Sequence, residues 1–162
     1  MLGTVADMGH VRVMSLVPPE EAAAGGLPNE TICGYWEESG AGGAPTFREN
    51  PAFVELLHRV IATAALADPS MREAAKRQGE GFLYVIDLRT PDGPQGDVPG
   101  VDVVGGFALK RGVLMPGSYQ ANPNHRLVTS DGAFILPPGL NQAVVDEVVR
   151  LTREYSRPGG ET

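Results

Sequence analysis

Clusters of glycine and proline cut this chain into short segments, and they constrain its fold more than any other feature. The 162 residues include 21 glycines and 14 prolines, a share well above the ~12% of an average protein. The clusters lie at residues 18–28, 39–45, 91–100, 116–123, 137–139 and 158–160. Glycine and proline interrupt regular structure and favour turns, so each helix or strand has to fit between two clusters.

Two helices are predicted in the first half of the chain. The first begins after Asn50, a favourable N-cap followed by proline, and apolar residues recur at helical spacing over 53–65. The second covers residues 70–78, because Asp68 repeats the cap-then-proline signature and Gly79 suits a helix end. These elements predict a helical pair.

Most of the predicted strands lie in the second half of the chain. Strands are predicted at residues 10–17, 29–37, 81–89, 101–110, 113–119, 127–129 and 133–136. The run at 81–89 is apolar throughout, which favours a central strand buried on both faces. Residues 81–136 are expected to form one antiparallel sheet of about five strands, packed against the helical pair and a closing helix over 141–155. Because strands gather instead of alternating with helices, the predicted class is α+β.

The domain organisation follows from this pattern and from the chain length. One core is expected, so residues 1–162 are predicted to form a single domain. A flexible loop is expected at about residues 39–46, where small residues predominate, and a frayed tail at 157–162.

The charge balance limits the partners. The chain has 13 lysine and arginine residues against 20 acidic ones, a formal net charge of -7. Such a domain repels phosphate backbones, so nucleic acid is not an expected partner, whereas a basic protein partner is compatible. No apolar run approaches a membrane span, and no secretory signal is present at the N-terminus. With one cysteine, Cys33, no internal disulfide can form. A soluble cytoplasmic protein is the expectation.

The common cofactor motifs are missing from the sequence. The glycine run at 40–45 lacks the lysine of a phosphate-binding loop, and Gly105-Gly106 is predicted to mark a bulge or a close backbone approach. His10, His58 and His125 do not have zinc-ligand spacing, and His58 beside an apolar helical face is expected to be a half-buried packing residue. No cofactor, metal or catalytic residue is predicted.

One polar segment stands out as a candidate binding site. It runs from Tyr119 to Arg126 and contains Asn122, Asn124 and His125 between two apolar segments. One interpretation is a structured turn whose side chains bond to their own backbone; the other is a ligand or partner site, in which Arg126 binds a carboxylate.

Two further residues join this candidate site. Asp87 is a carboxylate in an apolar strand and needs a partner, for which Arg89, Arg126 and His125 are candidates. A structural ion pair is favoured over an Asp87–His125 acid–base pair, because no nucleophile in a recognisable setting accompanies them. Trp36 flanks the glycine-rich loop and serves either as core or as part of a binding lid.

Three segments in the middle of the chain resemble a known family. They are Gln78–Asp87, Asp97–Phe107 and Ala121–Arg126. Their order and composition are similar to those of small actinobacterial proteins associated with type VII secretion systems, although Leu88 and Gly100 replace prolines of the family pattern and His125 replaces a tyrosine. The resemblance covers about 50 residues. It implies a bacterial protein with an accessory or immunity-like role and no catalytic residues.

Two functions are therefore carried forward. The first is a non-enzymatic interaction protein, of a secretion-accessory, adaptor or immunity type, with homo-oligomer formation left open. The alternative is a small-molecule-binding protein or cryptic enzyme with a polar site around Asp87, Tyr119, His125 and Arg126.

Overall fold

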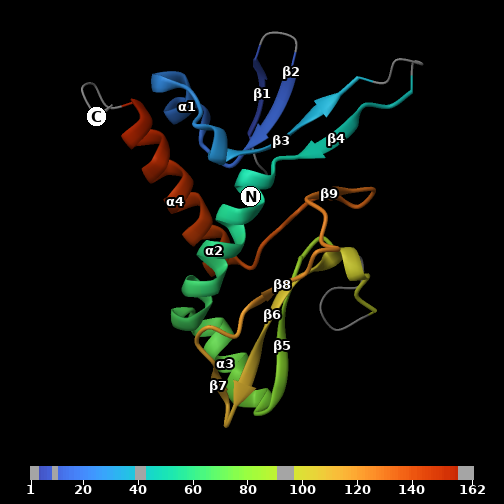
Figure 1. Ribbon diagram of the computed structural model, residues 1–162, viewed down its shortest axis with the longest axis vertical. Coiled ribbons are helices and arrows are strands. Elements are labelled where there is room, and N and C mark those ends of the chain that lie inside the picture. The colour runs from blue at the N-terminus through green and yellow to red at the C-terminus, as the bar shows by residue number, and fades with distance from the viewer. Residues whose placement is uncertain (1–3, 9–10, 39–42, 91–96, 157–162) are drawn as a thin grey trace. The chain divides into compact units, whose positions relative to one another are not determined.

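A computed structural model describes residues 4–8, 11–38, 43–90 and 97–156 of this chain (Figure 1). The chain divides into two compact units. The N-terminal unit comprises Met1–Leu57 with Val144–Thr162, and the central unit comprises His58–Ala143. His10, residues 39–42 of the loop expected at 39–46 and the tail expected at 157–162 lie outside the described residues.

The three long helices form where the sequence predicts them, and two of them begin directly after the predicted capping residues. The helix α2 (Pro51–Ala67) follows Asn50, whose Oδ1 accepts a hydrogen bond from the Ala52 N–H at 3.2 Å. The helix α3 (Pro69–Gln78) follows Asp68, whose carboxylate accepts the Met71 N–H at 3.0 Å. The closing helix, α4 (Pro138–Ser156), starts three residues before the predicted range. All three helices are confirmed, and the starts of α2 and α3 were predictable because a capping side chain acts within the first turn of its helix.

The N-terminal unit contains an antiparallel sheet in chain order, formed by β1 (Thr4–Met8), β2 (Val11–Ser15), β3 (Ile32–Glu37) and β4 (Thr46–Glu49). A short helix, α1 (Pro19–Gly25), follows β2, and a 3-10 turn, η1 (Asn29–Thr31), precedes β3. The strands β2 and β3 were expected, whereas β1 and β4 were not. The helices α1 and α4 are joined by an exposed ion pair, in which Arg153 Nη2 lies 2.6 Å from Glu21 Oε1.

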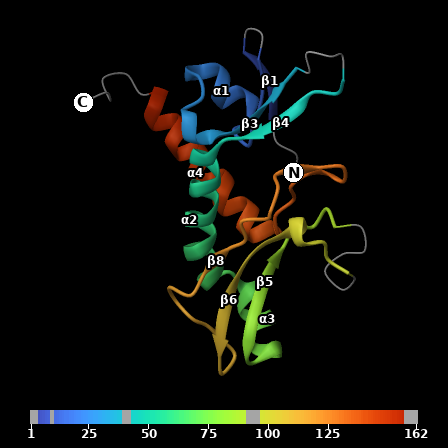
Figure 2. The same ribbon diagram turned by 45° about the vertical axis from the view of Figure 1, so that its right-hand side comes forward.

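The central unit contains two separate sheets. The larger one is formed by β5 (Gly81–Ile86), β6 (Val103–Lys110), β7 (Val113–Leu114) and β8 (Gln120–Ala121), with the order β5-β6-β7 and β8 also paired to β6. A 3-10 turn, η2 (Gly100–Asp102), leads into β6. The smaller sheet is formed by β9 (Val128–Thr129) and β10 (Gly132–Ala133). The helix α3 packs against β5 and β7 (Figure 2).

The α+β class is confirmed, but the single five-stranded sheet over residues 81–136 was wrong. After β8 the chain turns, and the His125 N–H donates to the Asn122 carbonyl at 3.1 Å. This turn leads the chain away from β6, so β9 and β10 pair with each other alone in the described part of the chain.

The prediction that residues 81–89 form a central strand was also wrong. Among the described residues, β5 pairs only with β6, and it therefore lies at the edge of its sheet. Phe82 and Tyr84 are 39% and 56% exposed, whereas Val85 is 1% exposed. Alternate residues of a strand face opposite sides. The apolar run hid this alternation, because the side that faces outward also carries apolar residues.

The strand β6 has the irregularity predicted at its glycines. The register between β5 and β6 shifts between Val85 and Ile86, so that Val85 pairs with Gly105 and Ile86 with Val103. One residue of β6, Val104, is therefore a bulge.

Membrane insertion by a helix has no support in the described residues, where no helix is both long and apolar enough to cross a bilayer.

Candidate functional site

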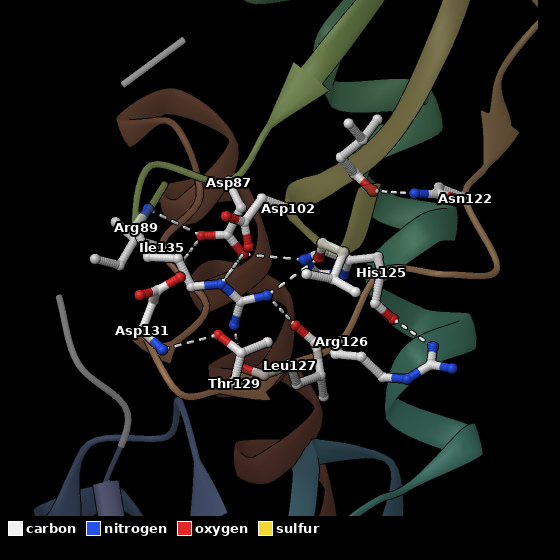
Figure 3. Close-up of polar contacts among 12 residues, drawn as sticks. Asp87, Arg89, Asp102, Asn122, His125, Arg126, Leu127, Thr129, Asp131 and Ile135 are labelled. Atoms are coloured by element: carbon white, nitrogen blue, oxygen red, sulfur yellow. Dashed lines mark hydrogen bonds and ion pairs between the residues drawn. The ribbon is translucent and has the colours of Figure 1, made fainter. Parts of the chain in front are cut away.

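Asp87 and His125 are in direct contact. Asp87 follows β5 and is 0% exposed, and its Oδ2 lies 2.9 Å from His125 Nε2 (Figure 3). Its Oδ1 accepts the Ile135 N–H at 2.8 Å and the Arg89 N–H at 3.2 Å. The carboxylate thus ties the end of β5 to two later parts of the chain.

Arg89 is the centre of this cluster. Its Nε donates to Asp102 Oδ1 at 2.9 Å and lies 3.5 Å from Asp87 Oδ2, so the predicted structural ion pair of Asp87 is confirmed with Arg89 as partner. The remaining guanidinium donors bond to the backbone carbonyls of Val101, Arg126, Leu127 and Gly132. All five N–H groups of the guanidinium are therefore used in holding four segments together. We call Asp87, Arg89, Asp102 and His125 the buried network.

Asp102 was missed from the sequence, although it gives the same signal as Asp87. Each is an aspartate in an apolar segment, and each is 0% exposed. Oδ2 of Asp102 and the hydroxyl of Thr90 are the two buried side-chain atoms left without a hydrogen-bond partner among the described residues.

The polar turn after β8 is a structured turn, as one interpretation of the sequence predicted. Asn122 Nδ2 donates to the carbonyls of Gly100 and Val103 at 2.8 and 2.7 Å, and its Oδ1 accepts the Asn124 N–H at 3.1 Å. Arg126 is exposed, and its guanidinium donates to the carbonyls of Pro123 and His125. Among the described residues, Arg126 therefore binds backbone carbonyls and no carboxylate.

Tyr119 contacts α2, and among the described residues no hydrogen bond joins it to the buried network. Its Oη lies 2.7 Å from His58 Nδ1, and its ring centroid lies 5.0 Å from that of Phe107. Burial, with a smaller contribution from His125, lowers the pKa of His58 to about 4. Burial also raises the pKa of Tyr119. Both side chains are neutral at pH 7, and His58 is half-buried as predicted.

Trp36 belongs to the N-terminal unit. Its ring packs edge-on against Phe47 with centroids 4.9 Å apart, and the Arg12 guanidinium lies 5.5 Å above it. The ring is thus a cross-strand packing element of the β3–β4 pair, while the other six predicted site residues lie in the central unit.

A groove crosses the outer face of the larger sheet of the central unit, and the sequence did not predict it. Its volume is about 420 Å³, and it is lined by Phe82, Tyr84, Val103, Gly105, Gly106, Gln120, Ala121, Asn122 and Pro123. We call these nine residues the outer groove. The rings of Phe82 and Tyr84 stack with centroids 6.3 Å apart.

The two glycines of β6 explain why the groove is open. A Cβ on Gly106 would lie 2.9 Å from the Tyr84 ring, on the groove side, whereas a Cβ on Gly105 would lie 2.6 Å from the Tyr119 ring, on the interior side. Residue 106 pairs with Tyr84 on one strand and with Gln120 on the other. Any larger side chain at position 106 would fill the floor of the outer groove.

Asn122 connects the buried network to the outer groove. It lines the groove, and it belongs to the turn that His125 anchors through Asp87. The polar residues predicted as a site therefore hold one wall of the groove in place, and the surface in contact with solvent is largely apolar.

Metal and thiol chemistry find no support among the described residues. No group of three or more His, Cys, Asp and Glu side chains there is arranged to hold a metal ion. Cys33 is buried, and its burial raises the pKa of the thiol to about 12, so the reactive thiolate is suppressed at neutral pH.

Comparisons with known proteins give no relative of this chain: no protein-family model, no curated protein sequence and no solved structure matches it significantly.

Proposed function

We propose that this chain is a non-enzymatic interaction protein, and that its central unit binds an extended, uncharged segment of a partner protein in the outer groove. The observation that carries the proposal is the pair of exposed, stacked rings, Phe82 and Tyr84, on a strand at the edge of a sheet.

The edge position of β5 suits an extended ligand. Within the described part of the chain, β5 has a strand on one side only, so its other side can pair with an added strand once the Phe82 carbonyl exchanges its hydrogen bond from Gln78 Nε2, which is 2.7 Å long. The strand carries neither proline nor a charged residue over Gly81–Ile86, two devices by which edge strands avoid such pairing. An added strand would place alternate side chains beside Phe82 and Tyr84.

The chemistry of the groove defines the partner segment. None of its nine residues is charged, although the chain as a whole has 33 charged residues. A charged segment would lose water there without gaining an ion pair, whereas aromatic or aliphatic side chains would be favoured. Gln120 offers an amide group at the opposite wall, whereas the amide of Asn122 is engaged with the backbone of its own turn and of the segment before β6. Nucleic acid is disfavoured because the groove has no cation.

The resemblance of residues 78–126 to type VII secretion-associated proteins supports an accessory or immunity-like setting for this binding. The net charge of -7 and a single buried cysteine are compatible with a soluble bacterial cytoplasmic protein. The accessory or immunity-like role and the cytoplasmic location are parts of this proposal.

Selection of peptides tests the proposal. Linear random peptides displayed on phage are selected on the full chain, and the affinities of selected peptides are measured by titration calorimetry. Phe82→Ser/Tyr84→Ser should weaken binding at least about tenfold, because two exposed anchor rings are lost. Val113→Ser is the matched control, since Val113 is 58% exposed in the same unit but lies outside the groove. Equal affinity for the wild type and the double variant would refute the groove.

The contact between Asp87 and His125 favours a second candidate, a small-molecule site at the buried network. Against it, the two side chains are 0% and 3% exposed, so a ligand could reach them only after the turn opens. NMR titration with a library of small polar compounds separates the candidates. A compound that shifts the His125 ring signals but not those of Tyr84 would support the small-molecule site.

A further inference from the structure

The central unit has a basic end, in contrast to the acidity of the whole chain. Five exposed cations come from α3 and from the turn between β6 and β7: Arg72, Lys76, Arg77, Lys110 and Arg111. The same two segments, residues 69–80 and 110–116, contain two acidic residues, Glu73 and Glu80. We call these five residues the basic end.

The fold brings the two segments together. The Gly112 N–H donates to the Gly79 carbonyl at 2.8 Å, and a Cβ on Gly112 would lie 3.3 Å from the Lys76 Cα. The Arg111 N–H donates to Glu80 Oε1 at 3.3 Å. The end of α3 and the β6–β7 turn therefore form one surface (Figure 1).

A pocket of about 270 Å³ lies in this surface. Its lining is mostly apolar and includes two cations, Arg72 and Lys76; the other lining residues are Leu66, Ala75, Gly112, Val113, Leu114 and Pro116. The two cations are four residues apart on α3 and so lie on the same side of the helix. The pocket thus combines an apolar recess with two positive charges.

The cations of the basic end form no ion pairs with other described residues. Throughout the described residues, none of the five cations is in an ion pair. Lys76 and Arg77 stabilise the C-terminal end of the helix dipole. That effect does not account for Arg72 at the middle of α3, or for Lys110 and Arg111 in the turn. Asp68, the acidic residue that precedes α3, is engaged with the Met71 N–H.

We propose that the basic end is a second docking surface and that its occupant is an acidic peptide segment with one aliphatic side chain. The aliphatic side chain enters the pocket beside Val113, and carboxylates on either side of it pair with Arg72 and Lys76. Charge complementarity carries this choice: two cations line the apolar recess and three more lie on the same two segments, and none of the five is in an ion pair with another described residue. They attract carboxylates, while the acidic remainder of the chain repels them. The proposal does not depend on the outer groove.

A labelled pentapeptide, Asp-Glu-Leu-Glu-Asp with blocked ends, tests this inference by fluorescence anisotropy on the full chain. Arg72→Gln/Lys76→Gln should weaken its binding at least about tenfold, because two charge-assisted contacts are lost. Arg59→Gln/Arg126→Gln is the charge-matched control from the same unit and should change the affinity less than about threefold, since neither residue lines the pocket. Thermal unfolding of both double variants verifies that they are folded.

Four results would overturn the inference. They are failure of the wild-type chain to bind the pentapeptide, equal losses in the two double variants, undiminished binding when glycine replaces the leucine, and undiminished binding when amides replace the acidic side chains. Phe82→Ser/Tyr84→Ser should retain full affinity for the pentapeptide. The proposal for the outer groove and the proposal for the basic end can therefore be refuted independently of each other.

Discussion

Two regions of the central unit, the buried network and the outer groove, reverse the usual distribution of residues. At one end, the buried network places two carboxylates, a guanidinium and an imidazole out of contact with solvent, with hydrogen bonds to four segments (Figure 3). On the outer face, Phe82 and Tyr84 remain exposed around a groove without charge. The polar groups hold the framework and the apolar groups are left for a partner. Polar residues that look like a site in the sequence can therefore be structural.

The largest expected effect comes from removing the centre of the buried network. Arg89→Met should destabilise the chain by about 3–5 kcal/mol, because Asp87 and Asp102 would be left buried without their cation. Urea unfolding measures the loss. Arg126→Met, an exposed guanidinium in the same unit, should cost no more than about 0.5 kcal/mol. If the two substitutions lower the free energy of unfolding by the same amount, the buried network does not hold the central unit together.

The next largest effect concerns the turn that holds the groove wall. His125→Leu should destabilise the chain by about 1–3 kcal/mol, because Oδ2 of Asp87 loses the donor at 2.9 Å. The same variant should weaken peptide binding in the outer groove, since Asn122 is displaced with the turn. Asn124→Ala is the control because Asn124 is exposed. If His125→Leu binds the peptide with unchanged affinity, the buried network does not hold the wall of the outer groove in place.

Substitutions at two adjacent glycines, Gly105 and Gly106, compare the interior face of the larger sheet with its outer face. Gly105→Ala should cost about 1–3 kcal/mol, because its Cβ would lie 2.7 Å from the Gln120 carbonyl oxygen, which is backbone and cannot move aside. Gly106→Ala should cost less than about 1 kcal/mol, since the exposed Tyr84 ring can rotate away. Peptide affinity should show the opposite order, with the larger loss in Gly106→Ala. The same order in both measurements would contradict this assignment of faces.

The smallest expected effect is a pH dependence at the interior face. His58 has a pKa of about 4 in the folded chain, below its ordinary value of 6.5. The unfolded chain therefore binds a proton between pH 6.5 and 4 that the folded chain does not, so stability should fall as the pH falls through this window. The loss should be about 1 kcal/mol at pH 5, because the side chain is only partly buried.

His58→Gln should remove this part of the pH dependence while retaining a partner for the Tyr119 hydroxyl. Urea unfolding at pH 7 and pH 5 compares the two proteins. If the unfolding free energy of the wild type and that of His58→Gln fall by the same amount between pH 7 and pH 5, His58 does not cause the pH dependence.

The sequence predicted some contacts of the candidate site and missed others. The contact of Asp87 with Arg89 was predicted because the two residues are close in the chain, and an unpaired buried carboxylate is costly. Asp102 is 13 residues from Arg89, and nothing in its own segment indicates that partner. The exposed side of β5 was missed because a strand with apolar residues on both faces gives the same pattern whether one face is covered or open.

The sequence alone determined the three long helices of this protein, α2, α3 and α4, and the tertiary structure decided its sheets and its surfaces. Asn50 and Asp68 bond to backbone groups two and three residues further on, so the start of each helix is a local property. The neighbours of β5, the separation of β9 and β10 from the larger sheet and the position of the outer groove depend on contacts between segments far apart in the chain. Such contacts form only when the segments meet, and alternating apolar patterns do not specify which strands will pair.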